Sequence, residues 1–367
     1  MGENAVVLAR PHLVLSIAAR ALAVLAIAAA CSGPGATASP TPTPVPTASA
    51  TASTTTLATI APGTSASPTV GPSPTSASSP TPAPSPTLAA SPTPAQSPSS
   101  GSSLPNFRHV YVIILENKSY GSIVGAGNAP YLNSLIARYG LATNLDAETH
   151  PSEPNYIALT SGGLQGSDSD GTYNLNAPNL FDQIDASGRT WHVYAQGYPG
   201  GCYKSFQASA VADGTGAVGD YVRKHNPAIS YTSISGNSAR CAQITHLTGF
   251  DPAAADFEMI IPNEINDMHS SSTRAGDDFL RDFVPQITGS PAFANSLLII
   301  TWDEGAGSDT KGGGGHIATI LASPGMPPGS RFTDAATHYS ILRTIELAWG
   351  LPLLGAAATA STVTLPY

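Results

Sequence analysis

Near residue 105 the chain acquires the periodic pattern of a folded domain. Short apolar, β-branched runs alternate with amphipathic stretches, which predicts a sheet with helices on both faces. The runs that predict strands are 109–115, 191–195, 257–261, 297–302 and 316–322. The stretches that predict helices are 130–139, 178–186, 276–288 and 338–349. The 263 residues of 105–367 therefore suffice for one large α/β domain.

The start of the chain has the features of an export signal. Arg10 and Arg20 accompany an apolar run over 21–30, which is too short to span a bilayer because a membrane helix takes about 20 apolar residues. The end of this run, AAAC over 28–31, resembles a bacterial lipoprotein processing site, so lipidated Cys31 could provide membrane attachment. Ala28 departs from that motif, where a larger aliphatic residue is usual, so ordinary signal-peptidase cleavage is the alternative. Both interpretations of 1–31 predict an extracellular protein, secreted or held on the cell surface.

Residues 32–104 are dominated by Pro, Thr, Ser, Ala and Gly, and they contain no Lys, Arg, Asp or Glu. Such a composition cannot build a core, and prolines at this density favour extended polyproline II segments. We therefore predict a disordered linker that holds the domain away from the membrane or wall. Ligand binding by the proline segments is the less favoured alternative.

The predicted domain is acidic, with 13 Lys and Arg against 23 Asp and Glu, a net charge of −10. This charge argues against nucleic acid as a partner, since such binding usually needs a basic surface. After Cys31 the remaining cysteines are Cys202 and Cys241. An even pair in an exported protein predicts a disulfide. A cysteine nucleophile is the alternative, but neither residue has a suitable neighbourhood.

Oxygen ligands follow two of the predicted strands. Glu116 and Asn117 come directly after the first strand, and Asp303 and Glu304 directly after the fourth. If the sheet places these strands side by side, the four groups converge at its carboxyl edge, where open α/β sheets bind ligands. Oxygen donors suit a hard divalent cation, so Mg, Mn or Ca is favoured over zinc. For Glu116 and Asn117 alone, a loop start with a helix cap is the alternative.

Ser152 precedes an apolar stretch over 156–159 and lies two residues after His150. At a helix start its hydroxyl would lie beside unpaired backbone N–H groups, which also stabilise a phosphate oxygen or developing negative charge. That position suits a nucleophile. It equally suits an ordinary N-cap serine with Glu153 and Pro154 in the first turn.

Six segments together resemble, in order, the motifs of the bacterial phosphoesterase family. This family includes secreted acid phosphatases and phospholipases C and belongs to the alkaline phosphatase superfamily. The matching segments are 116–120 (ENKSY), 149–156 (THPSEPNY), 221–227 (YVRKHNP), 261–269 (IPNEINDMH), 301–304 (TWDE) and 338–346 (HYSILRTIE). The HPSEPNY form is most similar to the secreted acid phosphatases of the type made by mycobacteria. The resemblance implies a three-layer α/β/α sandwich of the alkaline phosphatase type.

The resemblance also implies roles for individual residues. Ser152 corresponds to a nucleophile that is coordinated to a metal and forms a phosphoserine. His269 and His338 would bind phosphate or protonate the leaving group, and His150 is a weaker candidate for the same pocket. A structural histidine bonded to a backbone carbonyl is the alternative for each. The implied metal ligands are Glu116, Asn117, Asp303 and Glu304.

A second metal is the less favoured variant. In zinc-using relatives of the superfamily a histidine after glycine can be a ligand, which makes His316 a candidate, and Asp267 with His269 could complete the site. We expect one metal, because Glu116 and Asn117 match the acid phosphatase arrangement. His225 could face the pocket or fix a turn. The remaining histidines of the domain, interpreted as structural, are His109, His192 and His246.

The resulting expectation is an exported acid phosphatase that acts on a small phosphate monoester. A phospholipase C-like phosphodiesterase is the first alternative, but the aromatic content of 7% and the lack of an evident amphipathic membrane helix give it little support. A non-catalytic surface binding lipoprotein is the second alternative. A sulfatase is disfavoured, since no cysteine occupies the nucleophile position.

Overall fold

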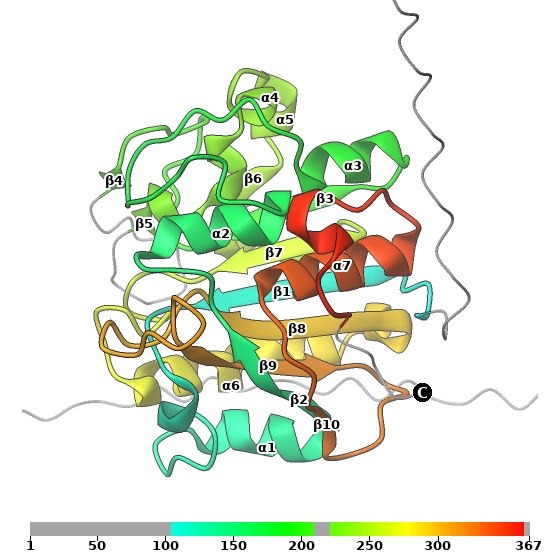
Figure 1. The fold of residues 1–367 in the computed structure, drawn as a ribbon. Coiled ribbons are helices and arrows are strands. Elements are labelled where there is room, and N and C mark those ends of the chain that lie inside the picture. Colours follow the sequence, from blue (N-terminus) through cyan, green and yellow to red (C-terminus); the bar gives the residue numbers. More distant parts are fainter. Residues whose placement is uncertain (1–103, 209–220, 363–367) are drawn as a thin grey trace, which may run out of the picture. The chain divides into compact units, whose positions relative to one another are not determined.

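The computed structural model describes residues 104–208 and 221–362 (Figure 1). The predicted export signal with Cys31, and the predicted linker up to residue 103, lie outside the described residues. The described part holds an eight-stranded mixed sheet with helices on both faces. The predicted three-layer α/β/α architecture is confirmed.

The main sheet has the strand order β10-β2-β9-β8-β1-β7-β3-β6. Strands β8, β1, β7, β3 and β6 run parallel, whereas β9 is antiparallel to both of its neighbours, β8 and β2. The bounds are β1 His109–Leu115, β2 Gly140–Asp146, β3 Trp191–Ala195, β6 Ile244–His246, β7 Phe257–Ile261, β8 Ser296–Trp302, β9 His316–Ala322 and β10 Ser330–Phe332. A separate two-stranded sheet consists of β4 Gln207–Ala208 and β5 Tyr221–Val222.

Two groups of helices cover the main sheet (Figure 1). Helices α1 (Pro130–Arg138) and α6 (Thr273–Thr288) pack together on one face. Helices α2 (Ser152–Ser161), α3 (Leu180–Ala186) and α7 (His338–Trp349) lie on the other. The shorter elements are α4 Thr232–Ser235, α5 Ser238–Cys241 and the 3-10 turns η1 Tyr120–Ser122, η2 Arg223–His225, η3 Pro227–Ser230, η4 Leu247–Gly249, η5 Pro291–Asn295 and η6 Gly355–Ala358.

The central strands are buried along their whole length because both faces of the sheet are covered. Every residue of β1 (HVYVIIL) and β8 (SLLIITW) is buried, as expected for parallel strands between two helical layers. Local signals fix the helix ends. Ser272 accepts a hydrogen bond from Ala275 N at the start of α6, and Thr337 with Ser340 forms a capping box on α7.

Strands β1 and β8 are direct neighbours, and Leu115 pairs with Trp302 at their carboxyl ends. The residues that follow these two strands therefore emerge at the same edge of the sheet, which is the condition that the predicted cation site required. Among the helices of the described residues, none has the length and apolar character needed to cross a membrane.

Candidate active site

The carboxyl edge of the sheet holds a set of linked acidic and amide groups. The Asn117 backbone N donates to Asp303 Oδ1 at 3.0 Å, which joins the end of β1 to the end of β8. The Asn117 side chain donates from Nδ2 to Glu116 Oε2 at 2.8 Å. Asn117 has a φ of 55°, a left-handed conformation that Asn adopts more readily than most residues. The turn after β1 thus links Asp303 to the Asn117 backbone and the Asn117 side chain to Glu116.

Ser152 is the first residue of α2, and Pro151 is the N-cap residue. The N-cap interpretation of Ser152 is therefore wrong by one position. Its hydroxyl instead faces carboxylates, with Oγ donating to Glu116 Oε2 at 3.1 Å and lying 3.5 Å from Glu304 Oε1. All ten residues of α2 are buried, so the hydroxyl is held in a closely packed environment.

Asp267, which follows β7, joins Glu116, Asp303 and Glu304 in one buried cluster of carboxyl groups. Burial raises the pKa of Glu116 well above its usual range, and the charges of Asp303 and Asp267 raise it further. Burial likewise raises the pKa of Asp267 and of Asp303. Burial and then the charge of Asp303 raise the pKa of Glu304 to about 7. The cluster therefore favours any group that brings positive charge to it.

The donor set fits a hard cation in its chemistry. Within the part of the chain that the structure describes, Asp303 Oδ2 and Asp267 Oδ2 are buried without a hydrogen-bond partner, which is costly for a carboxylate unless a cation compensates. As the side chains lie, however, residues 104–208 and 221–362 contain no group of three or more His, Cys, Asp or Glu that forms a metal-binding arrangement. Metal binding by the predicted ligands therefore stays a prediction.

Two aromatic side chains complete the cluster. The Tyr156 hydroxyl donates to Glu116 Oε1 at 2.5 Å. His225 lies with Nε2 3.1 Å from the same oxygen and Nδ1 3.4 Å from Asp267 Oδ2, and its ring stacks on Tyr156 at 5.5 Å. Burial lowers the pKa of His225 well below its usual range, so it is neutral. Tyr156 was counted among apolar residues from the sequence, although both residues lie in the family-like segments 149–156 and 221–227.

A model of the phosphoesterase family matches residues 125–352 of the chain. The chain belongs to the phosphoesterase family. It is 32% identical over 268 residues to the phosphatidylinositol-3-phosphatase of Mycobacterium tuberculosis, covering 72% of this chain and 84% of that protein. It is also 32% identical over 260 residues to an acid phosphatase of Aspergillus fumigatus, covering 68% of this chain but only 56% of the relative. The prediction of a hydrolase of phosphate esters is confirmed at the level of the family.

Among solved structures, the chain is similar to a protein in the alkaline phosphatase superfamily from Vibrio parahaemolyticus, with a TM-score of 0.47 and 12% identity. That match covers 69% of this chain and 70% of the other. A lipoteichoic acid synthase of Listeria monocytogenes matches with a TM-score of 0.46 and 9% identity, over 70% of this chain and 78% of the other.

At the carboxyl cluster, His150 lies beside Glu304, a predicted metal ligand. Its Nδ1 lies 2.7 Å from Glu304 Oε2, and its Nε2 lies 2.8 Å from the Asp309 carbonyl oxygen. Burial alone would lower the pKa of His150, but the Asp309 carbonyl and the Glu304 carboxylate outweigh that effect and raise it. His150 therefore orients Glu304, and any direct contact with phosphate remains a prediction.

His338 is the first residue of α7 and is fully buried. Its Nδ1 bonds to the Glu148 carboxylate, and its Nε2 donates to the Trp302 carbonyl oxygen at 2.9 Å. Burial alone would lower the pKa of His338, but the charge of Glu148 and the hydrogen bonds with Glu148 and the Trp302 carbonyl outweigh that effect and raise it. In this geometry His338 fixes the residue before Asp303, and the catalytic role given by the resemblance stays a prediction.

His269 lies at the more exposed side of the cluster. Its side chain is 33% exposed, and its ring lies 6.1 Å from that of His225. The His269 backbone N donates to Asp267 Oδ1 at 2.7 Å, while Nδ1 lies 3.2 Å from Ser270 Oγ. Of the predicted histidines, His269 thus combines nearness to the cluster with access to solvent, which suits the predicted exchange of a proton with a leaving group.

Of the candidates for a second metal, His316 is engaged within the fold. His316 Nε2 lies 3.0 Å from the Thr143 carbonyl oxygen, and its ring stacks on Tyr120 at 4.3 Å. The glycines before His316 have a structural use, since an added Cβ at Gly313 would lie 2.2 Å from the Glu148 carbonyl oxygen and one at Gly314 would lie 2.3 Å from that of Thr149. These glycines therefore let their loop pack against the segment that leads to Ser152.

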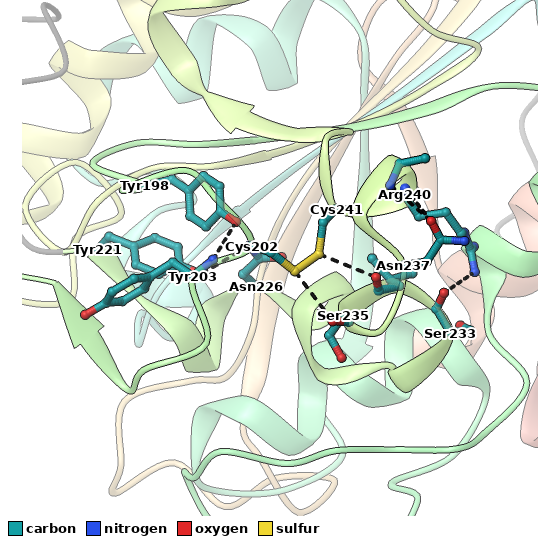
Figure 2. The surroundings of a disulfide bond; sticks show 12 residues. Tyr198, Cys202, Tyr203, Tyr221, Asn226, Ser233, Ser235, Asn237, Arg240 and Cys241 are labelled. Carbon is teal, nitrogen blue, oxygen red and sulfur yellow. Dashed lines mark hydrogen bonds between the residues drawn. A yellow bond between two sulfur atoms is a disulfide. The ribbon is translucent and has the colours of Figure 1, made fainter.

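Cys202 and Cys241 form the predicted disulfide, which links positions 39 residues apart (Figure 2). Tyr198 lies beside it and accepts a hydrogen bond from Tyr203 N at 3.0 Å. The cysteine-nucleophile alternative is therefore wrong. Two of the histidines interpreted as structural bond within the fold: His109 Nδ1 lies 2.8 Å from the Ala255 carbonyl oxygen, and His192 Nε2 lies 2.7 Å from Thr245 Oγ1.

Proposed function

We propose that the protein is an exported acid phosphatase that hydrolyses small phosphate monoesters through a phosphoserine on Ser152. The observation that carries this proposal is the Ser152 hydroxyl, which lies at the start of a buried helix and donates to Glu116 within the carboxyl cluster. Membership of the phosphoesterase family and the names of the two relatives, an acid phosphatase and a phosphatidylinositol-3-phosphatase, support the same chemistry.

The reaction has two steps. Ser152 Oγ attacks phosphorus, the new O–P bond forms, and the bond to the departing alcohol oxygen breaks. The serine proton passes to Glu116 Oε2, which accepts its hydrogen bond, and His269 at the exposed side is the candidate donor of a proton to the leaving oxygen. Water then attacks the phosphoserine, which releases inorganic phosphate and restores the hydroxyl. Positioning and charge neutralisation provide most of the catalysis in such reactions.

A divalent cation belongs to this proposal. Mg, Mn or Ca is favoured, and zinc is the alternative. A bound cation would lower the pKa of the serine hydroxyl and neutralise charge on the phosphoryl group. Oδ2 of Asp303 and of Asp267, which have no hydrogen-bond partner among residues 104–208 and 221–362, support binding of a cation here. The residues that would hold it are Glu116, Asn117, Asp303 and Glu304.

Export is supported by the disulfide, because such bonds persist in oxidising compartments outside the cytoplasm. Membrane attachment through lipidated Cys31 is part of the proposal and rests on the sequence alone. The net charge of −10 on residues 105–367 supports a small phosphate ester, rather than nucleic acid, as the partner.

Release of phosphate from an aryl phosphate monoester, measured between pH 5 and pH 9 with the full-length protein, tests the function. Ser152→Ala is compared with Ser134→Ala, which removes an exposed hydroxyl on α1, on the opposite face of the sheet. We expect activity in the wild type and in Ser134→Ala, and loss of at least about 10³-fold in Ser152→Ala. Undiminished activity in Ser152→Ala would exclude the serine mechanism. Hydrolysis of diesters alone would favour the phosphodiesterase, and no turnover would favour a binding role.

A further inference from the structure

The 3-10 turn η2 consists of three consecutive basic residues, Arg223, Lys224 and His225, all of them buried. Burial of an arginine and a lysine side by side is unusual, because a charged side chain is rarely enclosed without a partner. Arg223 Nη1 lies 3.8 Å from Oε1 of Glu153, and Glu153 is the residue that follows Ser152 in the sequence. His225 contacts Glu116 and Asp267, as described above. The turn therefore touches both the nucleophile helix and the carboxyl cluster.

Lys224, between these two residues, is joined to the nucleophile helix through Asp170. Its Nζ donates to Asp170 Oδ2 at 2.9 Å. The other oxygen of the same carboxylate, Oδ1, accepts a hydrogen bond from Glu153 N at 3.0 Å. One carboxylate thus holds the Lys224 ammonium and the first turn of α2 together. A lysine ammonium has three N–H donors, so this contact leaves capacity for another acceptor.

The Lys224 ammonium also lies within the electrostatic field of the cluster. The charges of Glu116, Asp170 and Asp303 raise its pKa against the opposing effect of burial, so the side chain stays cationic. The adjacent His225 is neutral. Lys118, the other lysine that faces the cluster, donates to the Met268 carbonyl oxygen at 2.7 Å, and burial lowers its pKa.

We propose that Lys224 binds a nonbridging oxygen of the substrate's phosphoryl group and favours dianionic monoesters over monoanionic diesters, with Asp170 as the positioning residue. A monoester carries three nonbridging oxygens and about two negative charges above its second pKa, which is near 6, whereas a diester carries two such oxygens and one charge. A fixed ammonium beside the additional oxygen therefore stabilises the monoester selectively. This inference rests on the proposed function of Ser152 and assigns it a substrate class.

The test compares kcat/KM for an aryl phosphate monoester and a bis-aryl phosphodiester at pH 7.5, in the full-length wild type, Lys224→Gln and Lys224→Arg. We expect Lys224→Gln to lower the monoester value by about 10²-fold to 10³-fold and the diester value by less than about 10-fold. Lys224→Arg keeps the positive charge, so its ratio of monoester kcat/KM to diester kcat/KM should stay close to that of the wild type. Lys204→Gln, at an exposed lysine near the disulfide, is the matched control.

Equal losses on both esters, or an unchanged monoester value, would overturn the inference while leaving the proposed function intact. A wild type that hydrolyses neither ester would overturn the proposed function and this inference with it. If Lys224→Gln does not fold, because Asp170 is left unpaired, the double variant Lys224→Gln/Asp170→Asn removes that carboxylate charge and carries the same comparison. Asp170→Asn alone should reduce the ratio of monoester kcat/KM to diester kcat/KM by about 3-fold to 10-fold.

Discussion

Glu258 provides a direct test of how burial controls charge in this fold. It lies in β7 with no exposed surface, and its Oε1 accepts a weak hydrogen bond from Ala255 N at 3.3 Å. Its Oε2 has no hydrogen-bond partner among the residues that the structure describes. Burial raises the pKa of Glu258 to about 8, with a smaller contribution from the charge of Asp251. The carboxyl is therefore mostly protonated in the folded protein at neutral pH.

The direction in which pH changes the stability of the fold follows from how many protons the folded and unfolded states bind. The folded-state pKa of Glu258 is raised above the value of 4.5 for an exposed glutamate, so the folded state keeps a proton that the unfolded state releases. Its contribution to stability is fully present below about pH 4.5 and is lost as the pH rises through about 8. Between these two values, each rise of one pH unit lowers the free energy of unfolding by about 1.4 kcal/mol. The loss at pH 7 is thus on the order of 3 kcal/mol, an upper bound because the fold relaxes around the charge.

Glu258→Gln replaces the carboxyl with a neutral group of the same shape and should remove this pH-dependent loss. Denaturant unfolding of the full-length protein at pH 5, 6, 7 and 8 measures the free energy of unfolding. We expect the variant to match the wild type near pH 5 and to exceed it by up to about 3 kcal/mol at pH 7. Asp282→Asn, at an exposed carboxylate of α6, is the control. A constant difference between Glu258→Gln and wild type across this range would refute the assignment of a buried neutral carboxyl.

Three other predictions concern the site and the disulfide. After chelation, added Mg²⁺ or Mn²⁺ should raise the Tm of the wild type by about 5 °C, but not that of Asp303→Asn; equal shifts would place the cation elsewhere. Tyr156→Phe should lower the free energy of unfolding by about 1.5–3 kcal/mol, because Glu116 loses a buried donor; an unchanged denaturant midpoint would contradict that contact. Replacing Cys202 and Cys241 together with Ala should cost about 2–4 kcal/mol, and a smaller loss would mean that the link does little to restrain the unfolded chain.

The elements found from sequence were those with a strong hydrophobic period. All five predicted strands and all four predicted helices are present, with small shifts at their ends. Strand β2 was missed because its sequence, GLATNLD, has few β-branched residues and is only partly buried. Strand β6 has three residues, too few to show a period. Both owe their conformation to neighbouring strands, which a local pattern does not encode.

Some features of the candidate site could likewise be predicted from the sequence, and others could not. The placement of Glu116 and Asp303 at one edge could be predicted, because consecutive polar residues end two buried strands and parallel strands share an edge. The Lys224 contact with Asp170 could not, since Asp170 lies in the run GSDSDG (166–171), which carries only loop signals. Nor does sequence show that the Tyr156 hydroxyl, within an apolar stretch, turns toward Glu116. Side-chain direction across separate elements requires the folded structure.

The negative and positive charges of the site come from different parts of the fold. The carboxylates of Glu116 and Asp303 follow neighbouring strands and are therefore positioned by the sheet itself. The basic turn η2 belongs to the segment between Cys202 and Cys241, where the helices and strands of the described residues are short. Ordering such a segment costs conformational entropy, and a covalent link between its ends reduces that cost by restricting the unfolded chain. The disulfide thus stabilises the segment that places Arg223 and Lys224 beside the carboxyl cluster, the arrangement on which the proposed binding of a phosphate dianion depends.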